Sequence, residues 1–392
     1  MERFVWRHPI EWARSKKRAA GALGFALGLS LLGIWGCGPS ASEESKATQV
    51  RPESDSIRWA TGFGFSEDRA TLWIAGDVPG DTVFWTKSNV ELGSRPGAHV
   101  LPQTPLKLAT WSTTHVPYVL ALGANGQWVG SGYLERVRQG DDVERVNLGG
   151  DAGLSDEALL ASDAMLLTSY PFGDPMVGVE NRTGIPVLSF SEYAEPHALG
   201  RAEYIKLFGW LLNRESLADS LFVGMELRYQ ELARMAKLEA DKTGWPTVFT
   251  GSESGGKWTA PTEAGLVAKM VRDAGGDYAF SDETAEAYGL HRSGSNYEVE
   301  LEQCALIAEN CDAWGRVVYA REGWTMKEVQ AEAPWCDFSS KLVFHCNTAE
   351  VDYFGSAVLE PDRMLRDLIS VLHPNVATPS EAPYFRRTPS SP

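Results

Sequence analysis

The sequence has few of the residues that build metal centres. Five cysteines and seven histidines are spread over 392 residues, with no C-x-x-C, H-x-x-x-H or H-x-H spacing. A zinc site needs converging ligands at such spacings, so we expect no resident metal and no cofactor. Basic residues are also scarce, because 36 Lys and Arg stand against 52 Asp and Glu, for a net charge of −16. Nucleic acid requires a basic surface and is therefore excluded as a partner.

The sequence has a single long apolar run, and it lies near the N-terminus. Six basic residues precede it, residues 19–36 are almost entirely Ala, Gly, Leu, Phe and Ile, and Cys37 follows directly. A basic start, an apolar run and a small residue at the cleavage point are typical of an export signal. The cysteine at this point resembles the lipobox of bacterial lipoproteins. We therefore predict a signal peptide over residues 1–36, lipidation of Cys37 and an anchored position in the cell envelope; a plain transmembrane anchor is the alternative.

The remainder of the chain predicts an α/β fold in two halves. Residues 37–56 are rich in Ser, Glu and Pro, which indicates a flexible tether. Strand-like and helix-like segments then alternate, as in a mostly parallel sheet covered by helices. At 215–240 a long amphipathic helix, with apolar residues every three or four positions, interrupts the alternation. This divides the chain into an N-terminal lobe at 57–214, an interlobe helix, and a C-terminal lobe at 241–392 that includes a final helix.

Several short segments, by their order and spacing, resemble one family of binding proteins. They are Thr113-Thr114-His115, Leu199 to Lys206, Trp258 to Pro261, Arg272 to Tyr278, Val351 to Phe354, and Pro361-Asp362-Arg363. With the lipobox, they are similar to the substrate-binding lipoproteins of ABC importers in the class III periplasmic-binding family, which carry ferric siderophores or cobalamin. The resemblance implies two Rossmann-like lobes joined by a single long α-helix. It also implies a monomer, a chelated-metal cargo with siderophore first and cobalamin second, and an ABC permease as partner.

The candidate ligand-binding residues lie in loops that follow predicted strands. Ligands of open α/β sheets bind beyond the carboxyl ends of the strands, so two facing lobes line one cleft with these loops. Aromatic rings with polar tips suit a large amphipathic ligand, and an arginine can pair with a carboxylate or catecholate. The predicted set is Thr113, Thr114, Tyr133, Tyr170 and Glu192 in the first lobe, and Trp258, Arg321, Tyr353 and Phe354 in the second.

Two carboxylates are candidates for docking to the permease. The resemblance implies one acidic residue on each lobe that fits a basic pocket of the permease, and the matching positions are Glu157 and Glu298. Such charge pairs set orientation and association rate more than affinity. The alternative is that each residue begins a helix and stabilises the helix dipole without any partner.

Four cysteines remain after Cys37, and an even number in an oxidising compartment indicates disulfides. Four cysteines allow three pairings, and we favour Cys304–Cys311 and Cys336–Cys346 because short separations meet easily. A zinc site at these cysteines is the weaker alternative.

The sequence supports no catalytic residue. The segment Gly251 to Gly255 has the outline of a nucleophile elbow, but Glu253 occupies the position that requires serine. The chain is thus expected to be a binding protein rather than an enzyme. Two alternatives stay open, namely an envelope enzyme and a protein-binding module on the same two-lobe scaffold, since fold does not fix function.

Overall fold

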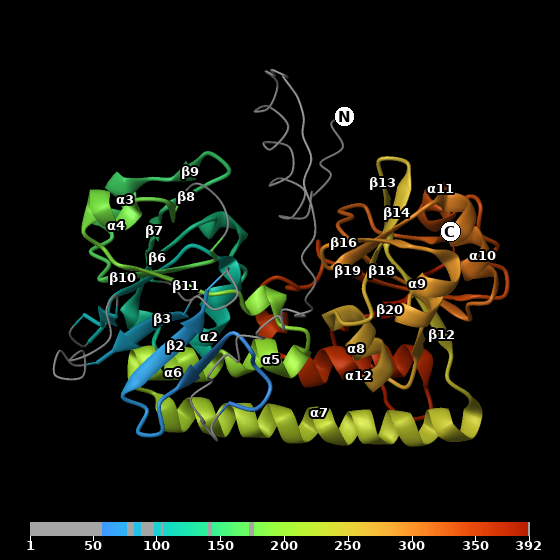
Figure 1. The fold of residues 1–392 in the computed structure, drawn as a ribbon, viewed down its shortest axis with the longest axis horizontal. Coiled ribbons are helices and arrows are strands. Elements are labelled where there is room, and N and C mark those ends of the chain that lie inside the picture. The colour runs from blue at the N-terminus through green and yellow to red at the C-terminus, as the bar shows by residue number, and fades with distance from the viewer. Residues whose placement is uncertain are drawn as a thin grey trace, which may run out of the picture.

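The structure is a computed structural model that describes residues 57–76, 82–87, 98–102, 105–139, 143–171 and 176–390. Two lobes lie side by side above one long helix, α7, which runs beneath both of them (Figure 1). The predicted signal peptide, Cys37 and the predicted tether lie outside the described residues. No helix in the described ranges is both long enough and apolar enough to span a membrane.

The first lobe is built on a parallel sheet with the order β11-β10-β5-β6-β7. Its strands are β5 (Leu108–Thr110), β6 (Trp128–Ser131), β7 (Val146–Asn147), β10 (Leu166–Ser169) and β11 (Val187–Ser189). The sheet is accompanied by α2 (Val116–Ala121), α3 (Asp156–Ala161), α4 (Val179–Thr183), α5 (Ala198–Glu203) and α6 (Ile205–Leu212). A second sheet joins β1 (Phe63–Phe65), β2 (Thr71–Ala75), β3 (Thr82–Thr86) and β4 (His99–Val100).

The second lobe repeats this plan and adds an antiparallel sheet. Its main sheet has the order β15-β12-β18-β19-β20, in which only the pairing of β20 is antiparallel. These strands are β12 (Thr247–Thr250), β15 (Asp277–Tyr278), β18 (Ala313–Val318), β19 (Leu342–Asn347) and β20 (Arg386–Arg387). The added sheet contains β13 (Ser252–Ser254), β14 (Lys257–Pro261), β17 (Asn296–Val299) and β16 (His291–Ser293). The helices are α8 (Leu266–Asp273), α9 (Asp282–Tyr288), α10 (Leu301–Glu309), α11 (Met326–Glu332) and α12 (Pro361–Leu372).

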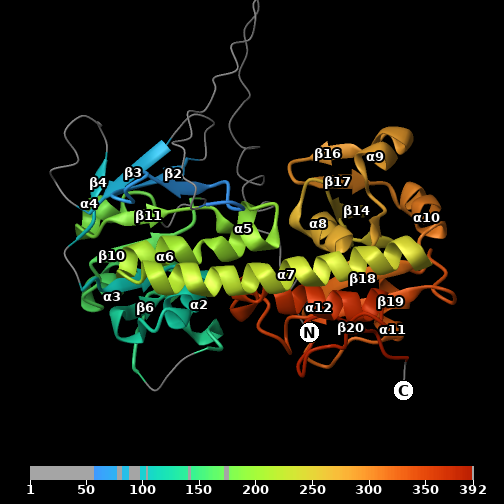
Figure 2. The same ribbon diagram turned by 90° about the horizontal axis from the view of Figure 1, so that it is seen from below.

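Helix α7 (Glu215–Thr243) has 29 residues, so it is about 43 Å long at 1.5 Å per residue. The predicted apolar stripe is buried at Met225, Tyr229, Leu232 and Ala236, whereas Leu217 is 41% exposed. Figure 2 shows α7 crossing both lobes, with the added sheet and α9 on one side of it and α12 with β18–β20 on the other. The helix ends at Gly244, whose positive φ of 103° a side chain would disfavour.

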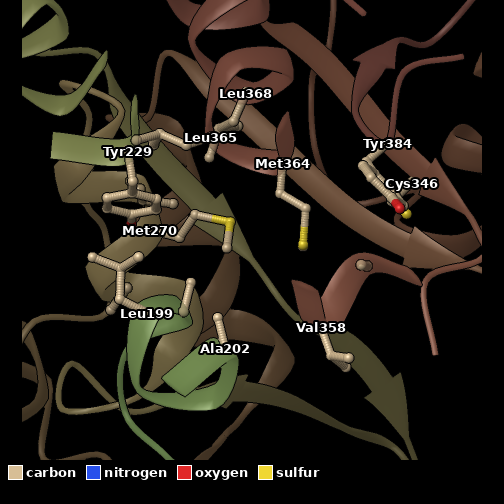
Figure 3. Close-up of a cluster of buried hydrophobic side chains, with 14 of the residues drawn as sticks. Leu199, Ala202, Tyr229, Met270, Cys346, Val358, Met364, Leu365, Leu368 and Tyr384 are labelled. Atoms are coloured by element: carbon tan, nitrogen blue, oxygen red, sulfur yellow. The ribbon is translucent and has the colours of Figure 1, made fainter. Parts of the chain in front are cut away.

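The lobes also touch each other directly above α7. Helix α5 of the first lobe packs against α8, α12 and the 3-10 turn η8 (Ser356–Leu359) of the second. Figure 3 shows Leu199 and Ala202 of α5 grouped with Met270 and Val358. These side chains belong to one continuous apolar core. Because interlobe side chains are packed as densely as a protein interior, we expect the lobes to move against each other as rigid bodies over small distances.

Two sequence predictions fail in the added sheet. Glu298 does not begin a helix but lies in the middle of β17, where it pairs with Thr259 and His291, and α10 starts three residues later with Glu300 as its N-cap. Trp258 does not follow a strand but lies within β14. Both segments alternate buried and less buried residues with a period of two, which is the pattern of strands.

Candidate functional site

The first predicted cleft residues lie where β5 and β11 end. After β5 the chain forms the 3-10 turn η3 (Thr113–His115), and the Ser112 hydroxyl accepts the amide N–H of Thr114 at 3.3 Å. The hydroxyl of Thr114 donates to Oε1 of Glu192 at 2.6 Å. The structure thus brings together two predicted residues that are 78 positions apart in the sequence.

Glu192 is 2% exposed and lies beside His115, which is fully buried. Nε2 of His115 and Oε2 of Glu192 are 3.5 Å apart, and among the described residues neither atom has a hydrogen bond. Burial by itself would raise the pKa of Glu192, but His115, Thr114 and Arg201 outweigh it and lower the pKa. A negative charge is therefore held directly beneath the strand ends of the first lobe.

Tyr133 and Tyr170 share an aromatic cluster with Trp111. Nε1 of Trp111 donates to the hydroxyl of Tyr170 at 3.0 Å, and the rings of Trp111 and Tyr133 are 5.5 Å apart. Burial raises the pKa of both tyrosines, so their hydroxyls stay protonated at neutral pH. Gly132 lies against the same ring, since a Cβ at this position would meet Trp111 at 2.5 Å.

Two small cavities lie between the lobes, and each has a volume of about 10 Å³, which is room for one water molecule. The inner cavity is next to α5 and is lined by Ala198, Arg201, Leu266, Met270, Tyr353, Ala357, Val358 and Met364. The outer cavity is lined by Thr113, Val116, Pro117, Arg136, Val137, Arg138, Gln139, Asp352 and Gly355. Pockets for drug-sized ligands have roughly 300–1,000 Å³, so a siderophore-sized ligand requires the lobes to separate.

Sequence reasoning missed three arginines that line these cavities. Arg138 reaches from the first lobe to the second, where its Nη2 donates to the carbonyl oxygens of Thr348 at 2.8 Å and Ala349 at 3.1 Å. Arg136 lies over the ring of Tyr133, with its guanidinium carbon 4.4 Å from the ring centre. Arg201 has a buried Nε with no hydrogen-bond partner among the described residues.

The sequence carried a signal for these arginines. The segment Leu134-Glu135-Arg136-Val137-Arg138 follows directly after the strand-end loop that contains Tyr133. Arg201 lies in a segment on which the family resemblance depends. The rule that ligands bind beyond the carboxyl ends of the strands therefore predicted the correct loop, but the residues chosen from it did not include the two arginines.

Three predicted ligand-binding residues of the second lobe, Tyr353, Phe354 and Arg321, do not lie together in one site. Tyr353 lines the inner cavity, and burial raises its pKa to about 12 although Arg201 opposes the shift. Phe354 is 49% exposed and packs edge-on against Tyr353. Arg321 is exposed and donates from Nε to the hydroxyl of Tyr319 at 2.8 Å, and it lines neither cavity.

The prediction that Trp258 lines the cleft is wrong. Its side chain has no exposed surface, and Nε1 donates to the carbonyl of Thr250 at 2.9 Å inside the second lobe. The indole ring stacks on Phe249 and packs edge-on against Trp335. Trp258 therefore fills the core behind the strand ends, where no ligand reaches it.

The two docking candidates differ in their surroundings. Glu157 is exposed on α3, which lies at the end of the first lobe away from α7 (Figure 1). Glu298 is half-buried on β17 in the added sheet of the second lobe. Only Glu157 is at a helix start, where the helix dipole accounts for an acidic residue without any partner.

The structure also corrects the cysteine prediction. Cys304, Cys311, Cys336 and Cys346 are all buried free thiols, and neither Cys304–Cys311 nor Cys336–Cys346 is bonded. Burial raises the pKa of Cys311 and Cys346 to about 12, so both remain protonated. Within the part of the chain that the structure describes, no group of three or more His, Cys, Asp or Glu side chains is arranged to hold a metal ion.

Known proteins were compared with the chain in sequence and in structure. No family model matches it. An uncharacterized lipoprotein from Methanocaldococcus jannaschii is 24% identical over 246 residues, which cover 61% of this chain. The match covers 55% of that lipoprotein, so the chain spans about half the length of its curated relative.

Solved periplasmic binding proteins share the fold over nearly their whole length. A periplasmic heme-binding protein from Pseudomonas aeruginosa superposes with a TM-score of 0.54 at 16% identity, covering 74% of this chain and 99% of that one. A periplasmic binding protein from Veillonella parvula gives 0.56 at 12% identity, with 79% and 99% covered. A siderophore-binding protein from Vibrio cholerae with Fe³⁺–Desferal bound gives 0.50 at 16% identity, with 68% and 98% covered. The chain therefore has the two-lobed α/β fold of the class III periplasmic-binding proteins, with its lobes joined by α7.

Proposed function

We propose that this chain is the lipid-anchored solute-binding protein of an ABC importer. It captures a chelated-metal ligand between its two lobes and delivers it to the permease. A ferric siderophore is the first candidate cargo and cobalamin the second. Heme joins the set to be tested, because a neighbour of the same fold binds heme and another binds a ferric siderophore. Export through the signal at 1–36 and lipidation of Cys37 hold the protein at the envelope.

The observation that carries the proposal is the composition of the interlobe cleft. Strand-end loops of both lobes meet at the outer cavity, where Thr113 and Arg138 face Asp352 and Gly355. Arg136 and Arg138 line the outer cavity, and Arg201 and Tyr353 line the inner one, which suits a chelating ligand with anionic groups.

A binding titration tests the proposal. Purified full-length protein in detergent is titrated with Fe³⁺–desferrioxamine, ferric citrate, heme and cyanocobalamin, and tryptophan fluorescence is recorded along with native mass spectra. We expect saturable binding of one chelate at one copy per chain, with no chemical change to the ligand. Turnover of a ligand into product favours the enzyme alternative, and binding of none of these ligands refutes the proposal.

The anchor and the permease contact have separate tests. Cys37→Ser is expected to release the chain from the membrane fraction without changing cargo affinity, and unchanged membrane retention contradicts lipid anchoring. Charge reversal at Glu157 and Glu298 is expected to reduce cargo-stimulated ATP hydrolysis by the permease. The reversal of exposed Glu302, on the outer side of α10, is the matched control.

A further inference from the structure

Arg138 is the side chain that ties the strand-end loops of the two lobes together at the outer cavity. It is exposed, and it extends from the first lobe to the carbonyl oxygens of Thr348 and Ala349 in the second. The acceptors follow β19, in the same loop that supplies Asp352 and Gly355 to the cavity wall. A guanidinium bound to neutral carbonyls forms weaker hydrogen bonds than one bound to a carboxylate. Its present partners can therefore be replaced by an anion.

The charges around Arg138 favour such a replacement. The outer cavity is lined by two arginines and one carboxylate, that of Asp352. The carboxylate of Asp352 accepts the N–H of Ser356 at 2.8 Å, so it is directed to its own loop. Arg136 has carboxylate partners, with Nη2 at 3.0 Å from Asp151, whereas the contacts of Arg138 are to carbonyls. Of the two arginines that line this opening, Arg138 is thus the one whose charge is not paired with a carboxylate among the described residues.

We propose that Arg138 is an anion-operated latch. It holds the lobes together through its hydrogen bonds to Thr348 and Ala349. When an anionic group of the cargo binds the guanidinium instead, the second-lobe loop is released and the ligand enters the cleft. This inference rests on the proposed solute-binding function and narrows it, because it assigns the cargo to anionic chelates. Neutral chelates do not displace the hydrogen bonds from Arg138 to Thr348 and Ala349, so the lobes must separate against these bonds. Arg138 is thus both a contact for the cargo and a positioning residue for the lobes.

The latch predicts opposite effects of one substitution on two kinds of ligand. In Arg138→Gln, affinity for heme or ferric citrate, which carry carboxylates, is expected to fall about tenfold, which is about 1.4 kcal/mol. Affinity for cyanocobalamin, which is neutral overall, or for Fe³⁺–desferrioxamine, which is a cation, is expected to stay unchanged or to rise, because the interlobe hydrogen bonds no longer oppose opening. Arg138→Lys keeps the charge but not the planar, forked geometry of the guanidinium. Its affinity for heme or ferric citrate should lie between those of the wild type and Arg138→Gln. Arg182→Gln, which removes an exposed arginine paired with Asp156 on α3, is the control and should alter no affinity.

A measurement without ligand separates this inference from the proposed function. Hydrogen–deuterium exchange of the full chain should be faster in Arg138→Gln at residues 134–139 and 348–355, and unchanged in Arg182→Gln. Unchanged exchange in both segments overturns the latch, as does an equal loss of affinity for anionic and neutral chelates. If the wild-type chain binds only neutral chelates, the anionic assignment is wrong while the solute-binding function stands. If it binds none, the proposed function fails, and the exchange experiment still decides whether Arg138 joins the lobes.

Discussion

Glu203 offers the sharpest test of how this structure is held together. Its carboxylate has no exposed surface and accepts the backbone N–H groups of Arg58 at 3.1 Å, Trp59 at 2.7 Å and Ala60 at 2.9 Å. It also pairs with the ammonium of Lys206 at 2.7 Å, which is 5% exposed. The first described residues of the chain are thus fixed to α5, the helix that also packs on the second lobe.

The substitution Glu203→Gln keeps the size of the side chain and removes its charge. With the NH₂ group in place of Oε1, the three backbone N–H groups keep Oε2, but the ammonium of Lys206 loses both its acceptor and its counter-charge. Breaking a buried ion pair costs about 3–5 kcal/mol, and we expect the free energy of unfolding to fall by about 3 kcal/mol. Glu231→Gln is the control, because Glu231 is 54% exposed beside Arg234, and it should leave the free energy of unfolding nearly unchanged.

Urea denaturation followed by tryptophan fluorescence measures both variants. The first lobe should unfold at lower urea in Glu203→Gln, and limited proteolysis should cut earlier near residue 60. Equal midpoints for the two glutamine variants, within about 0.5 kcal/mol, would refute the reasoning, because a buried network and a surface pair would then contribute alike. A broad transition with two phases is expected if the lobes unfold separately, and the comparison is then made on the first phase.

Three further predictions follow from burial. Burial lowers the pKa of His345 to about 4, so between pH 6.5 and 4 the unfolded chain takes up a proton that the folded chain does not. The free energy of unfolding, measured by urea titration, should therefore fall by up to about 3 kcal/mol as the pH is lowered across that window. His345→Asn should remove this pH dependence, and an unchanged dependence contradicts the assignment to His345. Trp258→Ala should cost about 3–5 kcal/mol in unfolding free energy, while Trp245→Ala, at a site that is 38% exposed, should cost little; similar losses would mean that Trp258 is not a core residue. The four buried thiols should resist maleimide in the native protein and all react after unfolding without reductant; fewer than four reactive thiols would indicate a disulfide.

Local patterns in the sequence were sufficient for the long-range plan of the fold. The apolar stripe predicted a helix over 215–240, and α7 runs over Glu215–Thr243. The alternation of strands and helices continues after this helix, beginning with β12 (Thr247–Thr250). These segments are long, strongly periodic, or bounded by turn residues, so each carries its own signal. The strand–helix alternation on both sides of α7 likewise indicated an α/β fold in two halves, and the family resemblance implied the class III fold that the solved neighbours share.

Residues in the added sheet were misplaced because strand pairing is non-local. The alternation around Trp258 and Glu298 was present in the sequence, but the two strands that pair are separated by more than thirty residues. A period of two over four or five residues is weak evidence by itself, and only the partner strand makes it a sheet. The same limit explains the cysteines, since a short separation in sequence says nothing of the directions in which the thiols point.

The amino-acid order alone determined the charge, the α/β class and the helix between the halves, and it predicts an export signal that ends at Cys37, because each depends on composition or on contacts within one segment. The tertiary structure alone decided which strand-end residues meet. It set Arg138 across the opening, Glu192 beside His115, and Trp258 inside the core. Such contacts join residues far apart in the chain, and their geometry is fixed only when two lobes pack against one shared helix.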